Sequence, residues 1–508
     1  MAGTGHARVL KAEVVVVGLG AGGAMALHDL AAAGVDVLGV EVGGYIDAQE
    51  MTLREEEMMP KLFAEAGARA TDDFAINVMQ GRGVGGSTLH NTNLCKRLPI
   101  EILEQWQDEY GVEGLLGDEL QRDFADVERL LNVHPVPDDQ VNPNNAALAR
   151  GVEALGYRGA RLSHNRKDCQ QSGFCELGCP NDGKQNASKV LVPPALSNGA
   201  RIVTDLRVDT LITRRGEVVG VRGHAPDASG RRDGAPVEIQ AGRVVLAASA
   251  TASAAIVKRS ALPDPYNLAG TNLHLHPGAM VIGIFDGPAD APIEGWLGVP
   301  QSTECTEFLE FGPRASKRVW LVPGFAHPGA AAGFMPGFGP SHGQMMRLFP
   351  RVACIITMLH DHASGRVSPG RGEKVHISYG LDAAEHEQLA LGMREAGRIL
   401  LAAGASRVII PLSPPRTIAT QRELDQIRAQ DLGPLCPPMA AVHPMSTLWM
   451  GKDPRRSVVD SRGEHHQVKG LFVADGSLFP TSIGGPPQIP IYTFGRLVAR
   501  HVLDSLRR

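Results

Sequence analysis

The feature that most constrains the fold is a glycine-rich turn that directly follows a short apolar run near the start of the chain. Residues 14–17 are four consecutive valines, and the sequence continues as Gly-x-Gly-x-x-Gly at Gly18, Gly20 and Gly23. The valines predict a buried strand, and the Ala- and Leu-rich stretch 24–33 predicts a helix. Gly18 permits a tight turn, Gly20 lets backbone approach a pyrophosphate, and Gly23 lets the helix pack on the strand.

A second strand and an acidic residue complete this unit. The apolar run 35–40 is followed by Glu41, eighteen residues after Gly23. A carboxylate at this place can accept hydrogen bonds from ribose hydroxyls. A glycine-rich turn alone is weak evidence, but strand, turn, helix, strand and acid in one unit favour a dinucleotide-binding site over a purely structural turn.

Length and composition narrow the class of protein. A chain of 508 residues predicts two domains, and 43% hydrophobic with 21% charged residues is typical of globular proteins. The net charge of −5 argues against nucleic acid as a partner, because phosphate binding needs a basic face. No uninterrupted apolar run reaches the length of a membrane span, and residues 1–8 carry no export signal, so we expect a cytoplasmic protein.

The seven cysteines do not suggest a disulfide framework, because their number is odd and they are spread over a long chain. Only Cys169, Cys175 and Cys179 cluster. This cluster lacks a Cys-x-x-Cys pair and a clear fourth ligand, although His164 is near in sequence. We predict a structural loop of buried thiols and no metal site, with a metal or redox role as the alternative.

Glycine-rich and apolar segments continue the pattern further along the chain. Residues 80–91 contain too many glycines for a strand or a helix interior, and such a loop can lie flat against a planar ligand. The segment 200–204 with Val208, and the segment 243–250, predict two more strands that join the first sheet.

Four motifs together resemble the glucose-methanol-choline family of FAD oxidoreductases. They are the Gly18 turn, Gly-Gly-Ser-Thr-Leu-x-Asn at 85–91, His-Pro-x-x-Thr-x-x-Met-Gly at 443–451, and Asp-Gly-Ser at 475–477. Their order and separation match the family at both ends of the chain. The stretch 169–184 is similar to the long-chain alcohol oxidase branch.

The resemblance implies FAD as the cofactor and assigns residues to it. It implies that Glu41 binds the adenosine ribose, that Val208 meets the adenine, and that Asp475 holds the ribityl chain. The segment from Arg82 to Asn91 would lie along the flavin and pyrophosphate. The full set of expected cofactor-binding residues is Gly18, Gly20, Gly23, Glu41, Arg82, Gly85, Gly86, Ser87, His90, Asn91, Val208, Asp475 and Gly476.

The resemblance also implies an α/β fold in two domains. A Rossmann-like FAD-binding domain would be assembled from residues 1–100, 185–270 and 435–508. A substrate or cap domain of α+β type, built on a mainly antiparallel sheet, would comprise residues 101–184 and 271–434. Within it, the spacing of Leu and Ala over residues 382–403 predicts a surface helix.

The expected reaction is oxidation of an alcohol to a carbonyl by hydride transfer to flavin N5, with O2 or another acceptor reoxidising the flavin. His443 stands where the family has its catalytic base, and histidine titrates near working pH. Pro486 occupies the position where relatives carry a second catalytic Asn or His, and proline offers only a carbonyl. Other polar groups whose place the sequence leaves open are His276, His465, His466 and Tyr492.

This departure keeps two alternatives open: a non-oxidative enzyme such as a lyase, and a flavoprotein that has lost catalysis. His90 carries a further alternative, because it lies four residues after the glycine pair, where choline and pyranose oxidases attach FAD covalently. It would either bond to the flavin or only contact it. We expect contact without a bond, because the other motifs resemble the long-chain alcohol oxidase branch.

Residues 323–350 are crowded with Gly, Pro, Phe and Met. Gly and Pro disfavour regular structure, and Phe and Met give adaptable apolar contacts. We therefore expect a mobile, irregular lid over an apolar pocket. As substrate we expect a small-molecule hydrophobic alcohol, such as a terpenoid, steroid, aryl or fatty alcohol, rather than a sugar. The alternative is an ordinary packed loop.

Overall fold

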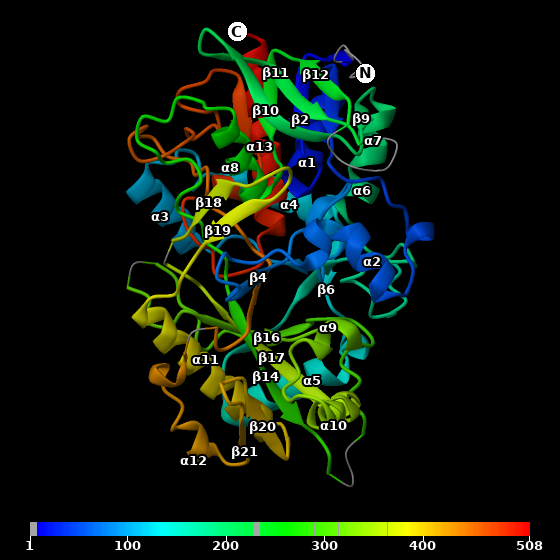
Figure 1. The fold of residues 1–508 in the computed structure, drawn as a ribbon, viewed down its shortest axis with the longest axis vertical. Helices are drawn as coiled ribbons and strands as arrows, with labels where there is room; N and C mark the ends of the chain where they lie inside the picture. Colours follow the sequence, from blue (N-terminus) through cyan, green and yellow to red (C-terminus); the bar gives the residue numbers. More distant parts are fainter. Residues whose placement is uncertain (1–7, 227–233, 288–290, 313, 363, 434) are drawn as a thin grey trace, which may run out of the picture.

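The computed structural model describes residues 8–226, 234–287, 291–312, 314–362, 364–433 and 435–508. Two large sheets organise these residues (Figure 1). A parallel sheet with helices α1 (Ala21–Ala32) and α13 (Gln488–Leu506) lies in the upper half of the view. A larger, mainly antiparallel sheet with helices α5 (Pro143–Leu155) and α11 (Ala383–Ala402) lies in the lower half. The predicted α/β class is confirmed.

The parallel sheet has five strands in the order β23-β13-β2-β3-β9, and every neighbouring pair is parallel. Its strands are β2 (Val14–Val17), β3 (Val37–Val40), β9 (Arg201–Val203), β13 (Arg243–Leu246) and β23 (Leu471–Val473). All four valines of β2 are buried, because both faces of the sheet are covered. The sheet thus unites the start, the middle and the end of the chain.

Two of the strand predictions hold only in part. Both predicted segments join the parallel sheet as β9 and β13, but Val208 lies in β10 (Arg207–Arg214) of a separate sheet, and Ser249 begins helix α8 (Ser249–Arg259). This second sheet has the order β1-β12-β11-β10, with β1 (Arg8–Lys11), β11 (Glu217–His224) and β12 (Pro236–Gln240). A tight turn with positive φ at Arg215 and Gly216 pairs β10 with β11, which takes Val208 out of the parallel sheet.

The larger sheet has nine strands, and all but one of its pairs are antiparallel. Its main path is β21-β20-β14-β17-β16-β15-β7, and β22 connects β14 with β4. The strands are β4 (Ile76–Val78), β7 (Gly159–Arg161), β14 (Gly278–Ile284), β15 (Thr303–Cys305), β16 (Val319–Pro323), β17 (Val352–Leu359), β20 (Arg407–Ile410), β21 (Arg416–Ile418) and β22 (Met439–Ala441).

Helix α11 packs on this sheet, as the sequence predicted for residues 382–403. It begins with a capping box in which Asp382 and Glu385 each accept a hydrogen bond from the other's backbone N–H. Its buried face includes Leu389, Met393 and Leu400.

The remaining helices and strands complete the fold. The helices are α2 (Glu55–Leu62), α3 (Ile100–Tyr110), α4 (Asp118–Leu130), α6 (Ala187–Val190), α7 (Val192–Ser197), α9 (Pro328–Ala332), α10 (Pro340–Leu348) and α12 (Gln421–Leu424). The strands are β5 (Leu94–Cys95), β6 (Val133–Pro135), β8 (Ser163–Asn165), β18 (Arg366–Pro369) and β19 (Val375–Ser378). Single turns of 3₁₀ helix lie at 86–89 and 476–478.

The predicted absence of regular structure over residues 323–350 is wrong, because this segment forms the two short helices α9 and α10. Pro328 and Pro340 stand in their first turns, where a missing N–H costs no hydrogen bond. The carboxylate of Glu55 accepts hydrogen bonds from the backbone N–H groups of Gly329 and Ala330 and so fixes the start of α9.

None of the helices in the described part of the chain is long and apolar enough to cross a membrane.

The close packing of α1 on the parallel sheet gives a stability prediction. A Cβ atom on Gly23 would lie 1.9 Å from the carbonyl oxygen of Gly18, so Gly23→Ala should destabilise the fold by about 1–3 kcal/mol. The matched control is Gly343→Ala in α10, where an added Cβ meets nothing within 4 Å. We expect a lower thermal unfolding midpoint for the first variant and an equal or higher one for the second; equal midpoints for Gly23→Ala and the wild type would contradict this packing.

Candidate active site

Two glycine-rich loops meet at the carboxyl ends of the parallel strands: the first is residues 18–23 and the second is residues 80–91. Gly20 is the N-cap residue of α1, and a Cβ atom on Gly86 would lie only 2.8 Å from the Cα atom of Gly20. A Cβ on Gly20 itself would meet nothing closer than 3.9 Å, because its open side faces a cavity. The loops therefore present bare backbone and the first N–H groups of α1 to the cavity, an arrangement suited to a pyrophosphate.

The cavity has a volume of about 430 Å³ and is lined by residues from both large sheets. Twelve of the residues predicted from the sequence line it: Gly18, Gly20, Glu41, Arg82, Gly86, Ser87, His90, Asn91, Val208, Asp475, Gly476 and His443. Gly23 and Gly85 do not line it. Gly23 instead contacts the β2–α1 turn, and Gly85 has a φ of +111° that shapes its loop.

Glu41 is held in the cavity wall by backbone donors. Its carboxylate accepts hydrogen bonds from the N–H groups of Leu19 at 2.9 Å, Gly43 at 3.1 Å and Gly83 at 3.2 Å. Burial raises the pKa of the Glu41 carboxyl, while these three donors act in the opposite direction. The carboxylate thus ties the Gly18 turn to the second glycine loop at the place predicted for a ribose.

Asp475 plays a similar part on the other side of the cavity. One carboxylate oxygen accepts from the backbone N–H of Ser249 at 2.9 Å and from the hydroxyl of Ser253 at 2.6 Å. The other accepts from the backbone N–H and the hydroxyl of Ser477. Burial raises the pKa of Asp475 and these donors oppose it. Asp475 therefore orients the start of α8 and the 476–478 turn along the cavity.

His90 and Arg82 leave buried polar atoms without a partner among the described residues. Nε2 of His90 and Nε of Arg82 have no hydrogen bond there, although both side chains line the cavity. Burial lowers the pKa of His90 to about 3, with the Lys184 charge adding to the effect, so its imidazole is neutral. Its ring packs against Phe63 with centroids 4.0 Å apart. Nε2 is thus available for a hydrogen bond or a covalent bond to a ligand.

Together these features fit FAD. Bare glycine backbone at a helix N-terminus suits the pyrophosphate, the buried carboxylates of Glu41 and Asp475 suit hydroxyl groups, and the unpartnered nitrogens suit a polar ring edge. Phosphate, ribose and ring would be bound along one continuous cavity.

His443 lies in the wall of the same cavity and is half-buried. Its Nδ1 atom is 3.2 Å from Nδ1 of His276. Burial lowers the pKa of His443 well below its ordinary value, and His276 lowers it further. Pro486 also lines the cavity. The structure therefore brings His443 and Pro486 to one cavity and adds His276 behind His443.

Of the four polar residues that the sequence left unplaced, only His276 contacts His443. His466 pairs with Ser457, and Nδ1 of His465 accepts a hydrogen bond from the backbone of Gln467. The hydroxyl of Tyr492 is buried without a hydrogen bond to a described residue. No local sequence signal singles out His276, because the His-Pro dipeptide that it shares with His443 also occurs at 134–135 and at 327–328.

Gln488 is a further residue that the sequence analysis missed. Its amide accepts a hydrogen bond from Asn91 at 2.9 Å and donates to the carbonyl of Leu94 at 2.6 Å. It therefore links the second glycine loop to the start of α13.

The cysteine cluster is less buried than predicted. Cys169, Cys175 and Cys179 are half-buried, and all seven cysteines of the chain are free. Within the part of the chain that the structure describes, no group of three or more His, Cys, Asp or Glu side chains could hold a metal ion. Lys184 fixes this loop by donating to the carbonyls of Leu89, Asn91 and Cys175.

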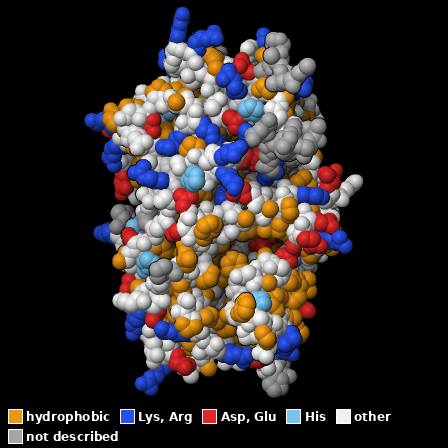
Figure 2. All heavy atoms as spheres, viewed as in Figure 1, with side chains coloured by type: hydrophobic (Ala, Val, Ile, Leu, Met, Phe, Trp, Pro, Cys, Tyr) orange, Lys and Arg blue, Asp and Glu red, His pale blue; other side chains and the backbone are white. Residues whose placement is uncertain are grey.

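One region of the cavity wall is apolar. Figure 2 shows hydrophobic side chains gathered around a hollow in the lower half of the molecule, where the larger sheet and helices α9 and α10 lie. The apolar residues that line the cavity in this region are Met280, Phe325, Ala326, Ala330, Phe334, Ile356 and Met358. The 323–350 segment thus contributes to the cavity wall.

Comparison with known proteins shows the family to which the chain belongs. Residues 59–278 and 361–495 match the N-terminal and C-terminal models described as GMC oxidoreductase. An uncharacterised GMC-type oxidoreductase of Mycobacterium tuberculosis, Rv0492c, is 34% identical over 97% of this chain and 76% of its own length. The long-chain-alcohol oxidase FAO4A of Arabidopsis thaliana is 28% identical over 98% of this chain and 69% of its own length.

Solved structures share the fold at low identity. Pyridoxine 4-oxidase from Mesorbium loti superimposes with a TM-score of 0.72 at 18% identity, covering 96% of this chain and 99% of that protein. Formate oxidase gives a TM-score of 0.72 at 16% identity, covering 99% and 100%. The chain belongs to the GMC oxidoreductase family, whose members bind FAD, and it is an FAD-dependent oxidoreductase.

The bare backbone that Gly20 and Gly86 present to the cavity, here called the glycine cradle, gives a prediction for cofactor binding. Gly20→Trp should abolish FAD binding, because the indole would fill the space that the cradle leaves open. The control is Gly380→Trp, an exposed position where an added Cβ meets nothing within 4 Å. Flavin absorbance per protein, after circular dichroism has shown that both variants fold, checks the prediction; full FAD occupancy in Gly20→Trp would refute the cradle.

Proposed function

We propose that this protein oxidises the CH–OH group of a hydrophobic alcohol to a carbonyl, with His443 accepting the hydroxyl proton. FAD, when bound, supplies the hydride acceptor. The observation that carries the proposal is the position of His443, which lines the same cavity as the glycine cradle. A neutral imidazole at the reacting end of a flavin site is suited to handling a hydroxyl proton.

The apolar region of the cavity supports the choice of substrate. Methionine and phenylalanine side chains from the larger sheet and the 323–350 segment favour an aliphatic or aromatic alcohol over a sugar, whose hydroxyls would need polar partners. The similarity to long-chain-alcohol oxidases points to the same class of substrate. O2 or another acceptor would then reoxidise the flavin.

A panel of alcohols tests this function directly. Mixing the holoenzyme with aliphatic, aromatic and polyhydroxy alcohols under anaerobic conditions should bleach the flavin absorbance with the hydrophobic members only. Absence of bleaching with every alcohol would instead favour the two alternatives that Pro486 leaves open, a lyase or a flavoprotein without catalysis. Assaying cleavage of a hydroxynitrile would then separate these two.

The proposed role of His443 gives a mutational prediction. His443→Ala should slow anaerobic flavin reduction by about 10²–10⁴-fold, the usual contribution of a positioned base. FAD binding should persist, because the glycine cradle and both buried carboxylates are untouched. His376→Ala, at an exposed position on β19, is the control and should reduce its flavin at the wild-type rate. Stopped-flow absorbance checks this, and unimpaired reduction in His443→Ala would place the base elsewhere.

The lowered pKa of His443 gives a second prediction. A base acts in its neutral form, which is present above its pKa and lost as the pH falls through it. Because burial holds the pKa of His443 well below 6.5, the rate of flavin reduction should stay constant from about pH 9 down to about pH 6. A rate that halves near pH 6.5 would show that His443 titrates like an exposed histidine.

A further inference from the structure

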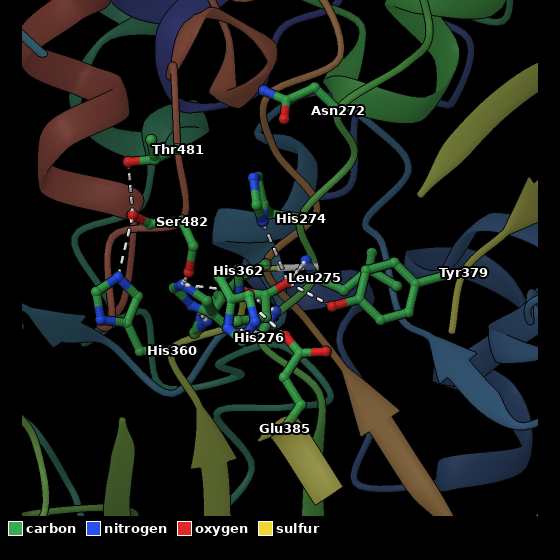
Figure 3. A network of polar contacts seen from close by, with 12 residues as sticks. Asn272, His274, Leu275, His276, His360, His362, Tyr379, Glu385, Thr481 and Ser482 are labelled. Carbon is green, nitrogen blue, oxygen red and sulfur yellow. Dashed lines mark hydrogen bonds and ion pairs between the residues drawn. The ribbon is translucent and has the colours of Figure 1, made fainter. Parts of the chain in front are cut away.

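His276 lies directly behind His443 and makes contacts that fix which of its own nitrogens carries the proton. It precedes β14, is 1% exposed, and does not line the cavity. Figure 3 shows it in a network of polar contacts that includes Ser482, His274 and His360. Its two ring nitrogens face different partners, and this difference decides its tautomer.

Nε2 of His276 is an acceptor. The backbone N–H groups of Ile483 and Gly484 donate to it at 3.2 Å and 3.1 Å, and the Ser482 hydroxyl lies 2.8 Å away. A backbone N–H group can only donate a hydrogen bond, so a proton on Nε2 of His276 would face two other donors. Neutral His276 must therefore carry its proton on Nδ1.

The surroundings keep His276 neutral. Burial lowers its pKa to about 4, and His274 and Arg318 act in the same direction. Asp361 opposes them, but its nearest oxygen lies 3.9 Å from Nε2 of His276, too far for a hydrogen bond. Asp361 instead accepts hydrogen bonds from the backbone N–H of Leu275 at 2.8 Å and from the Tyr379 hydroxyl at 2.7 Å. His360 also faces the His276 ring, with centroids 6.4 Å apart.

The Nδ1–H group of His276 points at Nδ1 of His443, 3.2 Å away. Since one of two facing nitrogens must accept, Nδ1 of His443 holds a lone pair, and neutral His443 carries its proton on Nε2. We propose that His276 is a positioning residue that sets the tautomer of His443, so that resting His443 offers an N–H group at Nε2 rather than a lone pair.

This inference rests on the proposed function and adds a condition to it: before His443 can accept the hydroxyl proton at Nε2, its own proton must move from Nε2 to Nδ1, against the Nδ1–H group of His276. Proton acceptance at Nε2 requires the other tautomer of His443, in which Nδ1–H would face Nδ1–H of His276. The Nδ1–H group of His276 thus destabilises both that neutral tautomer and the protonated imidazolium of His443. It therefore lowers the basicity of His443. In the resting tautomer, Nε2–H is suited to donating a hydrogen bond to a substrate oxygen.

Variants at this position must suit its backbone, because residue 276 has a φ of +53°. Asparagine tolerates this conformation, and its amide can still donate to Nδ1 of His443. Alanine removes the donor. Ser482→Ala is the matched control, because it removes one contact to Nε2 but leaves both backbone donors in place.

The test is ¹⁵N NMR of the holoenzyme with labelled histidine, using His443→Asn to assign the His443 signals. In the wild type, Ser482→Ala and His276→Asn, we expect His443 to be protonated on Nε2 and not on Nδ1, without titration between about pH 6 and 9. In His276→Ala, we expect Nδ1–H to appear and the titration midpoint to rise by about one unit or more. A wild-type His443 protonated on Nδ1, or a His276→Ala spectrum identical to the wild type, would overturn the proposal.

Two further measurements keep the test decisive. If His276→Ala does not retain FAD, the wild-type and Ser482→Ala spectra alone decide, because Nδ1–H in either contradicts the proposal. With an alcohol that bleaches the flavin, the rate of flavin reduction should fall as the pH is lowered, and this fall should begin at a higher pH in His276→Ala than in the wild type. Failure of every alcohol to bleach the flavin would count against the proposed function, but the tautomer would still be measured independently.

Discussion

The close approach of two backbones, at Gly20 and Gly86, is the contact on which the site depends. Gly86 can approach Gly20 this closely only because it carries no Cβ, which would lie 2.8 Å from the Cα atom of Gly20. The contact brings the first turn of α1 against the second glycine loop, and Glu41 ties the same two loops together through three backbone N–H groups. The bare backbone that results is what suits the carboxyl edge of the parallel sheet to cofactor binding.

The reacting end depends on a different constraint, the polar network behind His443. Two backbone N–H groups, at Ile483 and Gly484, fix the tautomer of His276, which in turn faces His443. The side chain that faces His443 is His276, which comes from a distant segment before β14.

Many of the residues expected to bind FAD could be predicted from the sequence, because the motifs that contain them are local. Glycines at fixed spacing and a run of valines report a turn and a buried strand without reference to the rest of the chain. Val208 lines the cavity, but it was wrongly expected in the parallel sheet, because a tight turn seven residues later pairs its strand with β11. Strand pairing of this kind depends on partners that local sequence does not report.

The surroundings of His443 were less predictable, because these contacts also depend on partners that local sequence does not report. His276 is separated from His443 by 167 positions, so only the folded chain shows their contact. In the 323–350 segment, composition predicted irregular structure, yet Pro328 and Pro340 start helices instead of preventing them. The apolar character of that segment was nevertheless informative, because Phe325 and Phe334 line the cavity.

The central claim is that the carbinol carbon of a hydrophobic alcohol gives up a hydride to the flavin on the side of the cavity that His443 lines. The most direct measurement compares anaerobic flavin reduction by a long-chain primary alcohol and by the same alcohol deuterated at the carbinol carbon. The account predicts slower bleaching with the deuterated alcohol and formation of the deuterated aldehyde. Bleaching at equal rates at saturating alcohol would show that C–H cleavage does not limit reduction. Absence of bleaching, or bleaching without formation of the aldehyde, would contradict the account.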